Sequence, residues 1–142
     1  AQQQGPFVSR GDDSGTHQKE RTLWQHAGLN PNDQSWYLEV GQGMGATLQI
    51  ANDKLAYTLA DRGTYLSYRQ SLLLQVVHEG DPLYANPYSV IAVNPQRHLH
   101  VQYDLAITFI NWLTSADGQR QIGSYRRAGQ VLFRPLTVTS KP

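Results

Sequence analysis

A short turn between an apolar strand and a helix constrains the fold of this chain more than any other stretch. Phe7 and Val8 are typical of the end of a buried strand, and residues 9–15 are of the types that form tight turns and helix caps. A helical pattern follows over residues 16–27 and stops at Gly28, which suits a left-handed C-cap. Strand, turn and helix in this order predict an α/β fold, in which ligands bind where the strands end.

The turn carries the donors that an anion requires. Backbone N–H groups at a helix start have no partner within the helix, and the helix dipole adds partial positive charge there. We therefore expect the N–H groups of Gly15 and Thr16, with the hydroxyls of Ser14 and Thr16, to bind an anion. Arg10 adds a full positive charge and a planar fork of donors that suits a tetrahedral oxyanion.

A plainer structural role explains the same residues. Asp13 or Ser14 is a suitable N-cap for the helix, because short polar side chains accept the unpaired N–H groups of its first turn. Arg10 then pairs with Asp12 or Asp13 on the surface. The residue types alone leave this role and anion binding both open.

Strand-like and helix-like segments alternate along the rest of the chain, as an α/β fold requires. Helices are predicted after the glycine-rich residues 41–45, from residue 61, from residue 103 and over residues 116–125. Strands are predicted over residues 54–60, 72–78, 89–93 and 131–133, and residues 35–40 fit either a strand or a short helix. The glycines at 41–45 either let the backbone approach a ligand or allow close packing, and no P-loop sequence follows them.

Composition excludes several functional classes. The 142 residues are enough for one domain. The 12 basic and 11 acidic side chains nearly balance, so nothing indicates binding to nucleic acid or to a membrane surface. The absence of cysteine excludes thiolate metal sites and cysteine nucleophiles. His98 and His100 would share one face of an extended segment, but no third ligand lies near them, so neither a metal site nor a cofactor is predicted. No apolar run approaches the roughly 18 residues of a membrane span, and no signal peptide is recognised.

Four stretches resemble the periplasmic tungstate-binding proteins of ABC transporters, a family of extracellular solute-binding proteins related to phosphate-binding proteins. The first, residues 9–17, reads Ser-Arg-Gly-Asp-Asp-Ser-Gly-Thr-His and contains the Arg-x-Asp-x-Ser-Gly-Thr pattern that both groups share. The others are Gly-Gln-Gly-Met-Gly at 41–45, Asp-Arg-Gly-Thr-Tyr-Leu at 61–66, and Asn-Pro-Tyr-x-Val-Ile-x-Val-Asn-Pro at 86–95.

This resemblance implies a lobe like those of type II periplasmic binding proteins, with a mixed, mostly parallel sheet flanked by helices. Residues 1–94 would form the second lobe, and residues 95–142 a helical C-terminal return to the first. The resemblance covers residues 7–135, and the family's N-terminal portion, with its Thr/Ser-rich anion-binding turn, is expected to be missing. That portion, or another copy of the chain, would then complete the site.

The resemblance also implies a ligand and a partner. The protein would bind tungstate or molybdate in the periplasm or outside the cell and deliver it to an ABC transporter permease. The ligand-binding residues would come from one turn: Ser9, Arg10, Asp12, Ser14, Gly15 and Thr16.

Asp12 leaves the choice of anion open. In the phosphate-binding pattern a carboxylate accepts a proton from the ligand, whereas tungstate and molybdate carry none near neutral pH. Asp12 would therefore repel these dianions unless Arg10 pairs with it. The flanking motifs favour tungstate, with molybdate equivalent to it, and phosphate remains the alternative.

Two other classes of function use the same residues. Ser14, His17 and Asp12 or Asp13 are the residue types of a catalytic triad, which would suit a phosphoester hydrolase. The Gly-x-Ser-x-Gly elbow is absent, however, so we predict no enzyme. A cytoplasmic module that senses an oxyanion is the other alternative.

Overall fold

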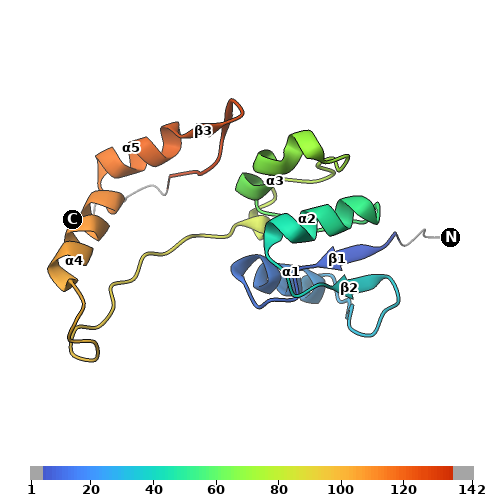
Figure 1. Ribbon diagram of the computed structural model, residues 1–142, viewed down its shortest axis with the longest axis horizontal. Helices are drawn as coiled ribbons and strands as arrows, with labels where there is room; N and C mark the ends of the chain where they lie inside the picture. The colour runs from blue at the N-terminus through green and yellow to red at the C-terminus, as the bar shows by residue number, and fades with distance from the viewer. Residues whose placement is uncertain (1–4, 136–142) are drawn as a thin grey trace. The chain divides into compact units, whose positions relative to one another are not determined.

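The computed structural model describes residues 5–135 of the chain. They fall into two compact units, Ala1–Asn86 and Pro87–Pro142, each of which has its own arrangement of helices and strands (Figure 1). The elements of the first unit are β1 (Phe7–Ser9), α1 (Gly15–His26), β2 (Tyr37–Glu39), α2 (Met44–Asp53) and α3 (Arg62–Tyr68), followed by two 3₁₀ turns, η1 (Arg69–Ser71) and η2 (Pro82–Tyr84). The strand at β1 and the helices at α1, α2 and α3 confirm the sequence predictions, and residues 35–40 contain a strand.

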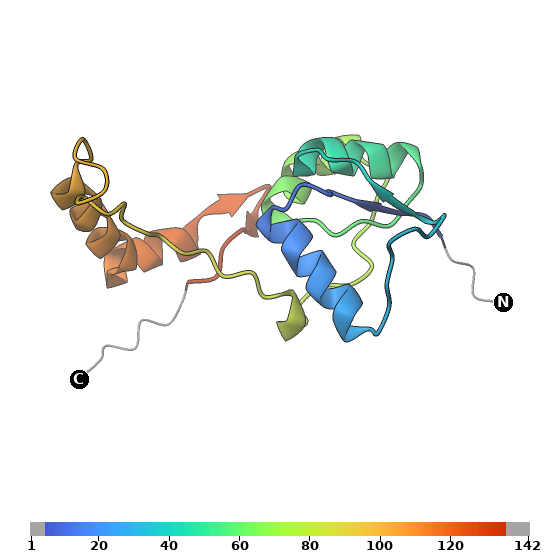
Figure 2. The same cartoon turned by 90° about the horizontal axis from the view of Figure 1, so that it is seen from below.

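Three parallel segments make the sheet of the first unit. β1 pairs with β2 in the register Phe7 to Tyr37 and Ser9 to Glu39. On its other edge, β1 meets Tyr57, whose carbonyl accepts the N–H of Val8 at 2.8 Å. β1 is therefore the central segment. Because all three segments are parallel, their carboxyl ends lie together along one edge of the sheet. Figure 2 shows α1 and α2 on opposite sides of β1.

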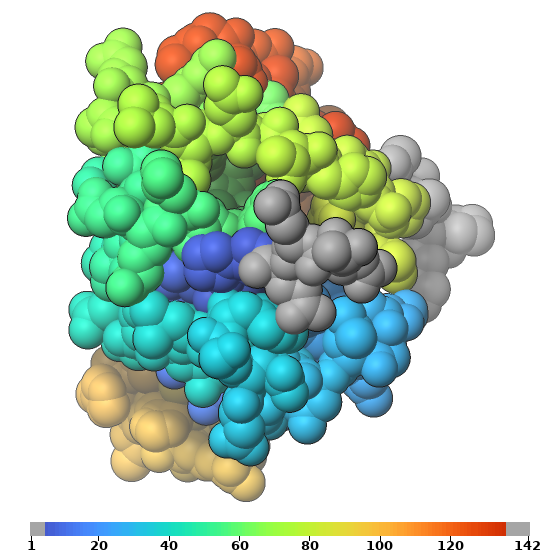
Figure 3. Space-filling view, turned by 90° about the vertical axis from the view of Figure 1, so that its right-hand side faces the viewer, coloured from blue at the N-terminus to red at the C-terminus, as the bar shows by residue number. Residues whose placement is uncertain are grey.

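The core of this unit lies between β1 and α2. Val8 is completely buried against Ala51 and Ala56. Met44, Leu48 and Ala51 form the buried face of α2, as their helical spacing predicts. In Figure 3 the start of β1, in dark blue, lies between the cyan segment that leads into β2 and the green segments that follow α2.

The ends of α1 follow from local chemistry. Ser14 is the N-cap, and its hydroxyl oxygen accepts the N–H of His17 at 3.4 Å. Gly28 follows the C-cap with a φ of 66°, in the left-handed region that glycine adopts without strain. Both ends therefore lie within one residue of the predicted bounds, 16–27.

The second unit contains α4 (Tyr103–Thr114), α5 (Ala116–Ser124) and an antiparallel pair, β3 (Arg126–Arg127) with β4 (Gln130–Val131). Ser115 caps α5 by accepting the N–H of Gly118 at 3.2 Å. Both helices confirm the predictions, whereas the predicted strand at 131–133 is shorter and begins one residue earlier. Within residues 5–135, no helix has the length and apolar character that crossing a membrane requires.

Three predicted strands are wrong. Residues 54–60 contribute only the bridge at Tyr57, and residues 72–78 and 89–93 adopt no regular structure. Leu73, Val77 and Ile91 are 79%, 78% and 85% exposed. An apolar run indicates that a segment is suited to burial, but a strand also needs a neighbour whose backbone groups pair with its own. Among the described residues, 54–60 has such a neighbour only at Tyr57, and 72–78 and 89–93 have no strand partner.

Candidate anion-binding site

The candidate site lies at the edge toward which the three parallel segments run. The turn that contains Arg10 follows β1, the glycine-rich loop follows β2, and Thr58 follows Tyr57. The first two are joined, because the N–H of Gln42 donates to the carbonyl of Arg10 at 3.2 Å. Loops and helix starts converge at this edge, as in other open α/β sheets that bind ligands where strand order reverses.

Of the nitrogens Nη2 and Nε in the Arg10 guanidinium group, only Nη2 is paired with another side chain. Its Nη2 donates to the carboxylate of Asp12, and the two side chains are only 17% and 22% exposed. Its Nε, in contrast, is buried and has no hydrogen-bond partner among the described residues. A buried cationic donor without an acceptor is costly in a folded protein, which makes this atom a candidate contact for an anion.

Asp12 anchors both Arg10 and the turn. Its second carboxylate oxygen accepts the N–H of Ser14 at 3.2 Å. Burial raises the pKa of Asp12, but the hydrogen bonds from Ser14 and Arg10 outweigh it and hold that pKa below its usual value. Asp12 is therefore ionised and engaged at neutral pH, and its charge is compensated by Arg10.

The start of α1 leaves two backbone donors unused. The N–H of Ser14 is taken by Asp12, and that of His17 by the Ser14 hydroxyl. The N–H groups of Gly15 and Thr16 make no hydrogen bond within the part of the chain that the structure describes. The structure therefore contains the N-cap at Ser14 and the Arg10–Asp12 ion pair that a purely structural role predicts. It also leaves the N–H groups of Gly15 and Thr16 available for a ligand.

Ser9 lies beneath the turn. Its side chain is fully buried, and its hydroxyl oxygen accepts the N–H of Gly11 at 3.3 Å. Ser9 is thus placed to support the turn from the interior.

A buried carboxylate links α1 to β2. The Tyr37 hydroxyl donates to Glu20 at 2.7 Å, and the indole N–H of Trp24 donates to the same carboxylate oxygen at 3.0 Å. Burial, together with the hydrogen bond to Glu20, raises the pKa of Tyr37 far above its usual value.

Thr58 is a further candidate that was not predicted from the sequence. Its hydroxyl is buried and has no hydrogen-bond partner among the described residues. It directly follows Tyr57, which places it next to β1 on the side opposite β2. The signal that could have identified Thr58 is its hydroxyl near the end of the predicted strand at 54–60.

The imidazole of His17 is not arranged as a base for Ser14. Its Nδ1 accepts the N–H of Asp13 at 3.0 Å, and its Nε2 lies 3.4 Å from a carboxylate oxygen of Glu39. Neither nitrogen is paired with the Ser14 hydroxyl, which accepts from the backbone instead. The geometry of a hydrolytic triad is therefore not formed by these residues.

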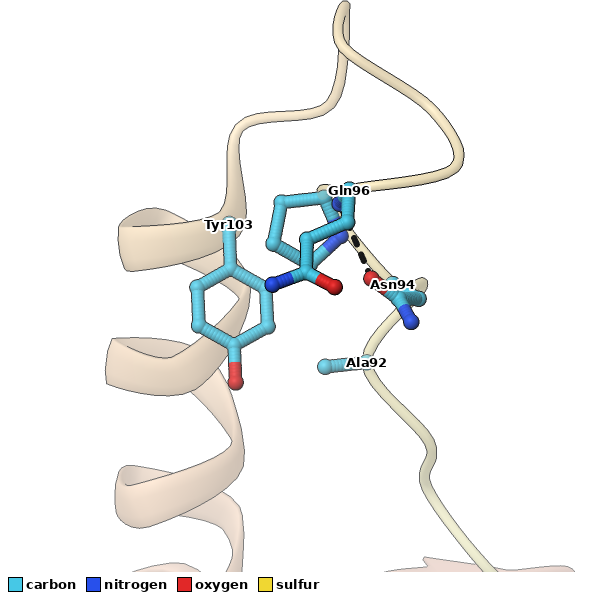
Figure 4. Close-up of a pocket in the computed structure, with 5 residues that line it drawn as sticks. Ala92, Asn94, Gln96 and Tyr103 are labelled. Carbon is cyan, nitrogen blue, oxygen red and sulfur yellow. Dashed lines mark hydrogen bonds between the residues drawn. The ribbon is translucent and has the colours of Figure 1, made fainter.

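Two other features of the chain are less suited to binding an anion. A concave region in the second unit is lined by Ala92, Asn94, Pro95, Gln96 and Tyr103 and has no charged side chain (Figure 4). His98 and His100 have ring centroids 6.2 Å apart, and the described residues contain no group of three side chains suited to a metal ion.

Comparison with known proteins places the fold. Residues 1–117 match the PBP superfamily domain. The chain belongs to the PBP superfamily. Its fold is the α/β arrangement of that superfamily, with helices around a small parallel sheet.

Several similar proteins have names that describe tungstate binding or tungstate transport. The chain is 42% identical over 137 residues to the tungstate-binding protein TupA of Peptoclostridium acidaminophilum, covering 95% of this chain and 48% of that protein. The tungstate-binding protein of Desulfovibrio alaskensis matches with a TM-score of 0.78 and 43% identity, over 94% of this chain and 55% of that one. A tungstate ABC transporter structure from Geobacter sulfurreducens gives a TM-score of 0.78 and 44% identity, over 85% of this chain and 51% of that one.

These comparisons confirm the resemblance to tungstate-binding proteins. The chain spans about half the length of the relatives that it matches. Their names describe tungstate-binding proteins or an ABC transporter rather than enzymes, in agreement with the prediction of a non-enzymatic role.

Proposed function

We propose that this chain binds tungstate, or molybdate, as part of the solute-binding component of an ABC importer. The observation that carries the proposal is the buried Nε of Arg10, a charged donor without an acceptor beside a helix start with unpaired N–H groups. The names of the related tungstate-binding proteins support the same ligand.

The proposed contacts come from one turn and one neighbouring segment. The anion receives the Nε–H of Arg10, the backbone N–H groups of Gly15 and Thr16, and the hydroxyls of Ser14 and Thr16. Thr58 adds a further hydroxyl from the opposite side of β1. Each charge-assisted hydrogen bond contributes about 1.5–3 kcal/mol net, so three or four of them total about 4.5–12 kcal/mol before the cost of association. Micromolar affinity, about 8 kcal/mol, lies within that range and is reached only where the cost of association is small.

Ser9 and Asp12 hold the site rather than touch the ligand in this proposal. Ser9 accepts the N–H of Gly11 from below, and Asp12 orients Arg10 and Ser14. Because the carboxylate of Asp12 already accepts from both neighbours, it is a poor acceptor for the proton of a phosphate ligand. This engagement favours an unprotonated dianion, tungstate or molybdate, over phosphate.

The names of the similar proteins support the partners and the location in this proposal. We place residues 1–94 in one lobe of a two-lobed binding protein and residues 95–142 in a return segment toward the other lobe. A permease receives the anion, and a segment equivalent to the relatives' remaining half, or another copy of the chain, supplies further donors. Two solved relatives, one of them 28% identical, are described as periplasmic, and we propose the periplasm for this chain.

Isothermal titration of the chain with tungstate, molybdate, phosphate and sulfate tests the proposal. Its mass in solution should be measured alongside, to detect association on binding. We expect saturable heats with tungstate and molybdate and much weaker ones with phosphate and sulfate. Equal binding of all four anions, or none of tungstate, would contradict the proposal.

A further inference from the structure

The turn before α1 satisfies its backbone donors selectively. The N–H of Asp13 donates to Nδ1 of His17 at 3.0 Å, and the N–H of Ser14 donates to Asp12 at 3.2 Å. The next two N–H groups, of Gly15 and Thr16, are left without partners among the described residues. Two side chains therefore determine which backbone donors remain for a ligand.

His17 does this from the third position of the helix. The residue at this position in a capping box reaches back to the backbone N–H of the N-cap. Here Asp12 already accepts from the N-cap, Ser14, and His17 reaches one residue further, to Asp13. In return, the backbone N–H of His17 donates to the Ser14 hydroxyl at 3.4 Å. The arrangement is a reciprocal cap that is extended by one residue.

The hydrogen bond fixes the imidazole as well as the turn. Because Nδ1 accepts, it carries no proton, and in the neutral ring the proton is on Nε2. Nε2 lies 3.4 Å from Oε1 of Glu39, at the end of β2, close enough for attraction but without the geometry of a hydrogen bond. The side chain is only 7% exposed, so the ring is largely shielded from solvent.

Asp13 needs such a restraint. Its φ is 55°, in the left-handed region that costs a non-glycine residue roughly 1–2 kcal/mol. Its side chain is 76% exposed and makes surface contacts with Gln18 at 3.2 Å and Arg21 at 3.5 Å. One of its carboxylate oxygens also lies 3.9 Å from Nδ1 of His17. The partly buried bond to His17 is therefore the main restraint on the backbone of Asp13 among its hydrogen bonds.

We propose that His17 is a positioning residue for the oxyanion site. Its Nδ1 holds Asp13 in the left-handed conformation and thereby aligns the N–H groups of Gly15 and Thr16, without itself touching the anion. This inference rests on the proposed function for its ligand, but the restraint on Asp13 is independent of any ligand.

Two substitutions separate the acceptor of His17 from its volume. His17→Asn places an amide oxygen where Nδ1 now lies but leaves space unfilled, whereas His17→Leu fills the space and removes the acceptor. We expect tungstate affinity to fall about tenfold or more in His17→Leu, the scale of one hydrogen bond lost with its donor left without a partner. His17→Asn should stay within about threefold of the unmodified chain. A residue that matters only for packing gives the opposite order, because leucine is then the better replacement.

Amide hydrogen exchange at Asp13 is the second readout. We expect protection of this amide in the unmodified chain and in His17→Asn, and faster exchange in His17→Leu. Nitrogen-15 NMR of the imidazole should show that the neutral ring carries its proton on Nε2. If the unmodified chain does not bind tungstate, the proposed function fails, while the exchange order still decides whether His17 holds the turn. Protection in His17→Leu equal to that in His17→Asn, or a proton on Nδ1, would overturn the inference.

Discussion

Replacing Arg10 tests whether two nitrogens of its guanidinium group have different roles, Nη2 in pairing with Asp12 and Nε in binding the anion. Nη2 is engaged by Asp12, and Nε is buried without a partner. Arg10→Ala removes both donors and the charge. Arg10→Lys keeps the charge on a single nitrogen, which the nearby carboxylate of Asp12 captures. We therefore expect lysine to rescue binding poorly, although it is the conservative replacement.

The magnitude follows from the contact that is lost. One charge-assisted hydrogen bond contributes about 1.5–3 kcal/mol net, which corresponds to a roughly 10-fold to 150-fold loss of affinity. Arg10→Lys should lose nearly as much as Arg10→Ala. The free energy of unfolding should fall by less than about 1 kcal/mol, because the ion pair with Asp12 is partly exposed to solvent.

Isothermal titration with tungstate measures the affinities, and urea denaturation measures the stabilities. Arg21→Ala is the matched control, because Arg21 is also paired with an aspartate of this turn, Asp13, at 3.5 Å, but is 61% exposed. We expect the control to bind tungstate like the unmodified chain. Unchanged affinity in Arg10→Ala, or full rescue by lysine, would refute the assignment of Nε to the anion.

Three further substitutions test neighbouring parts of the site. Thr58→Val should stabilise the ligand-free chain, because it removes a buried hydroxyl without a partner, and should weaken tungstate binding about twofold to tenfold; equal affinity by titration would exclude Thr58. Ser14→Ala should cost about 1 kcal/mol of stability in urea denaturation through loss of the N-cap, and Ser14→Gly only a few tenths; equal losses would contradict the capping role. The lowered pKa of Asp12 stabilises the fold above its usual value of 3.8, and this contribution is lost as the pH falls through the folded-state pKa. Acid denaturation of Asp12→Asn should therefore show a shallower pH dependence, and an identical profile would argue against the pairing with Arg10.

The part of the fold that local chemistry determines could be predicted from the sequence. Ser14 at the start of α1 and Gly28 after its end mark the helix limits, because caps depend on a few adjacent residues. The face of α2 could be predicted from spacing alone. The strands at 72–78 and 89–93 could not, because a strand depends on a partner that is distant in sequence. For the same reason, the central place of β1 between β2 and Tyr57 follows only from the structure.

The site could be predicted at the level of residues but not of their roles. The sequence places Arg10, Asp12 and Ser14 within one turn, and the pairing of Arg10 with Asp12 was one of two open alternatives. Which guanidinium nitrogen stays without a partner depends on burial, which no spacing encodes. The contribution of His17 was also hidden, since its side chain accepts from the residue four positions earlier rather than from a triad partner.

The direction from which these donors come limits what the turn achieves alone. A tetrahedral oxyanion has four oxygen atoms, and the proposed donors from Arg10, Ser14, Gly15 and Thr16 span seven consecutive residues at one edge of one sheet. They therefore approach the anion from one side, and the oxygens on the far side meet water or donors from elsewhere. Water on that side screens the charge of Arg10, so binding by the turn alone should weaken markedly as the salt concentration rises. High affinity requires the far side to be closed as well, which agrees with a site shared between two lobes.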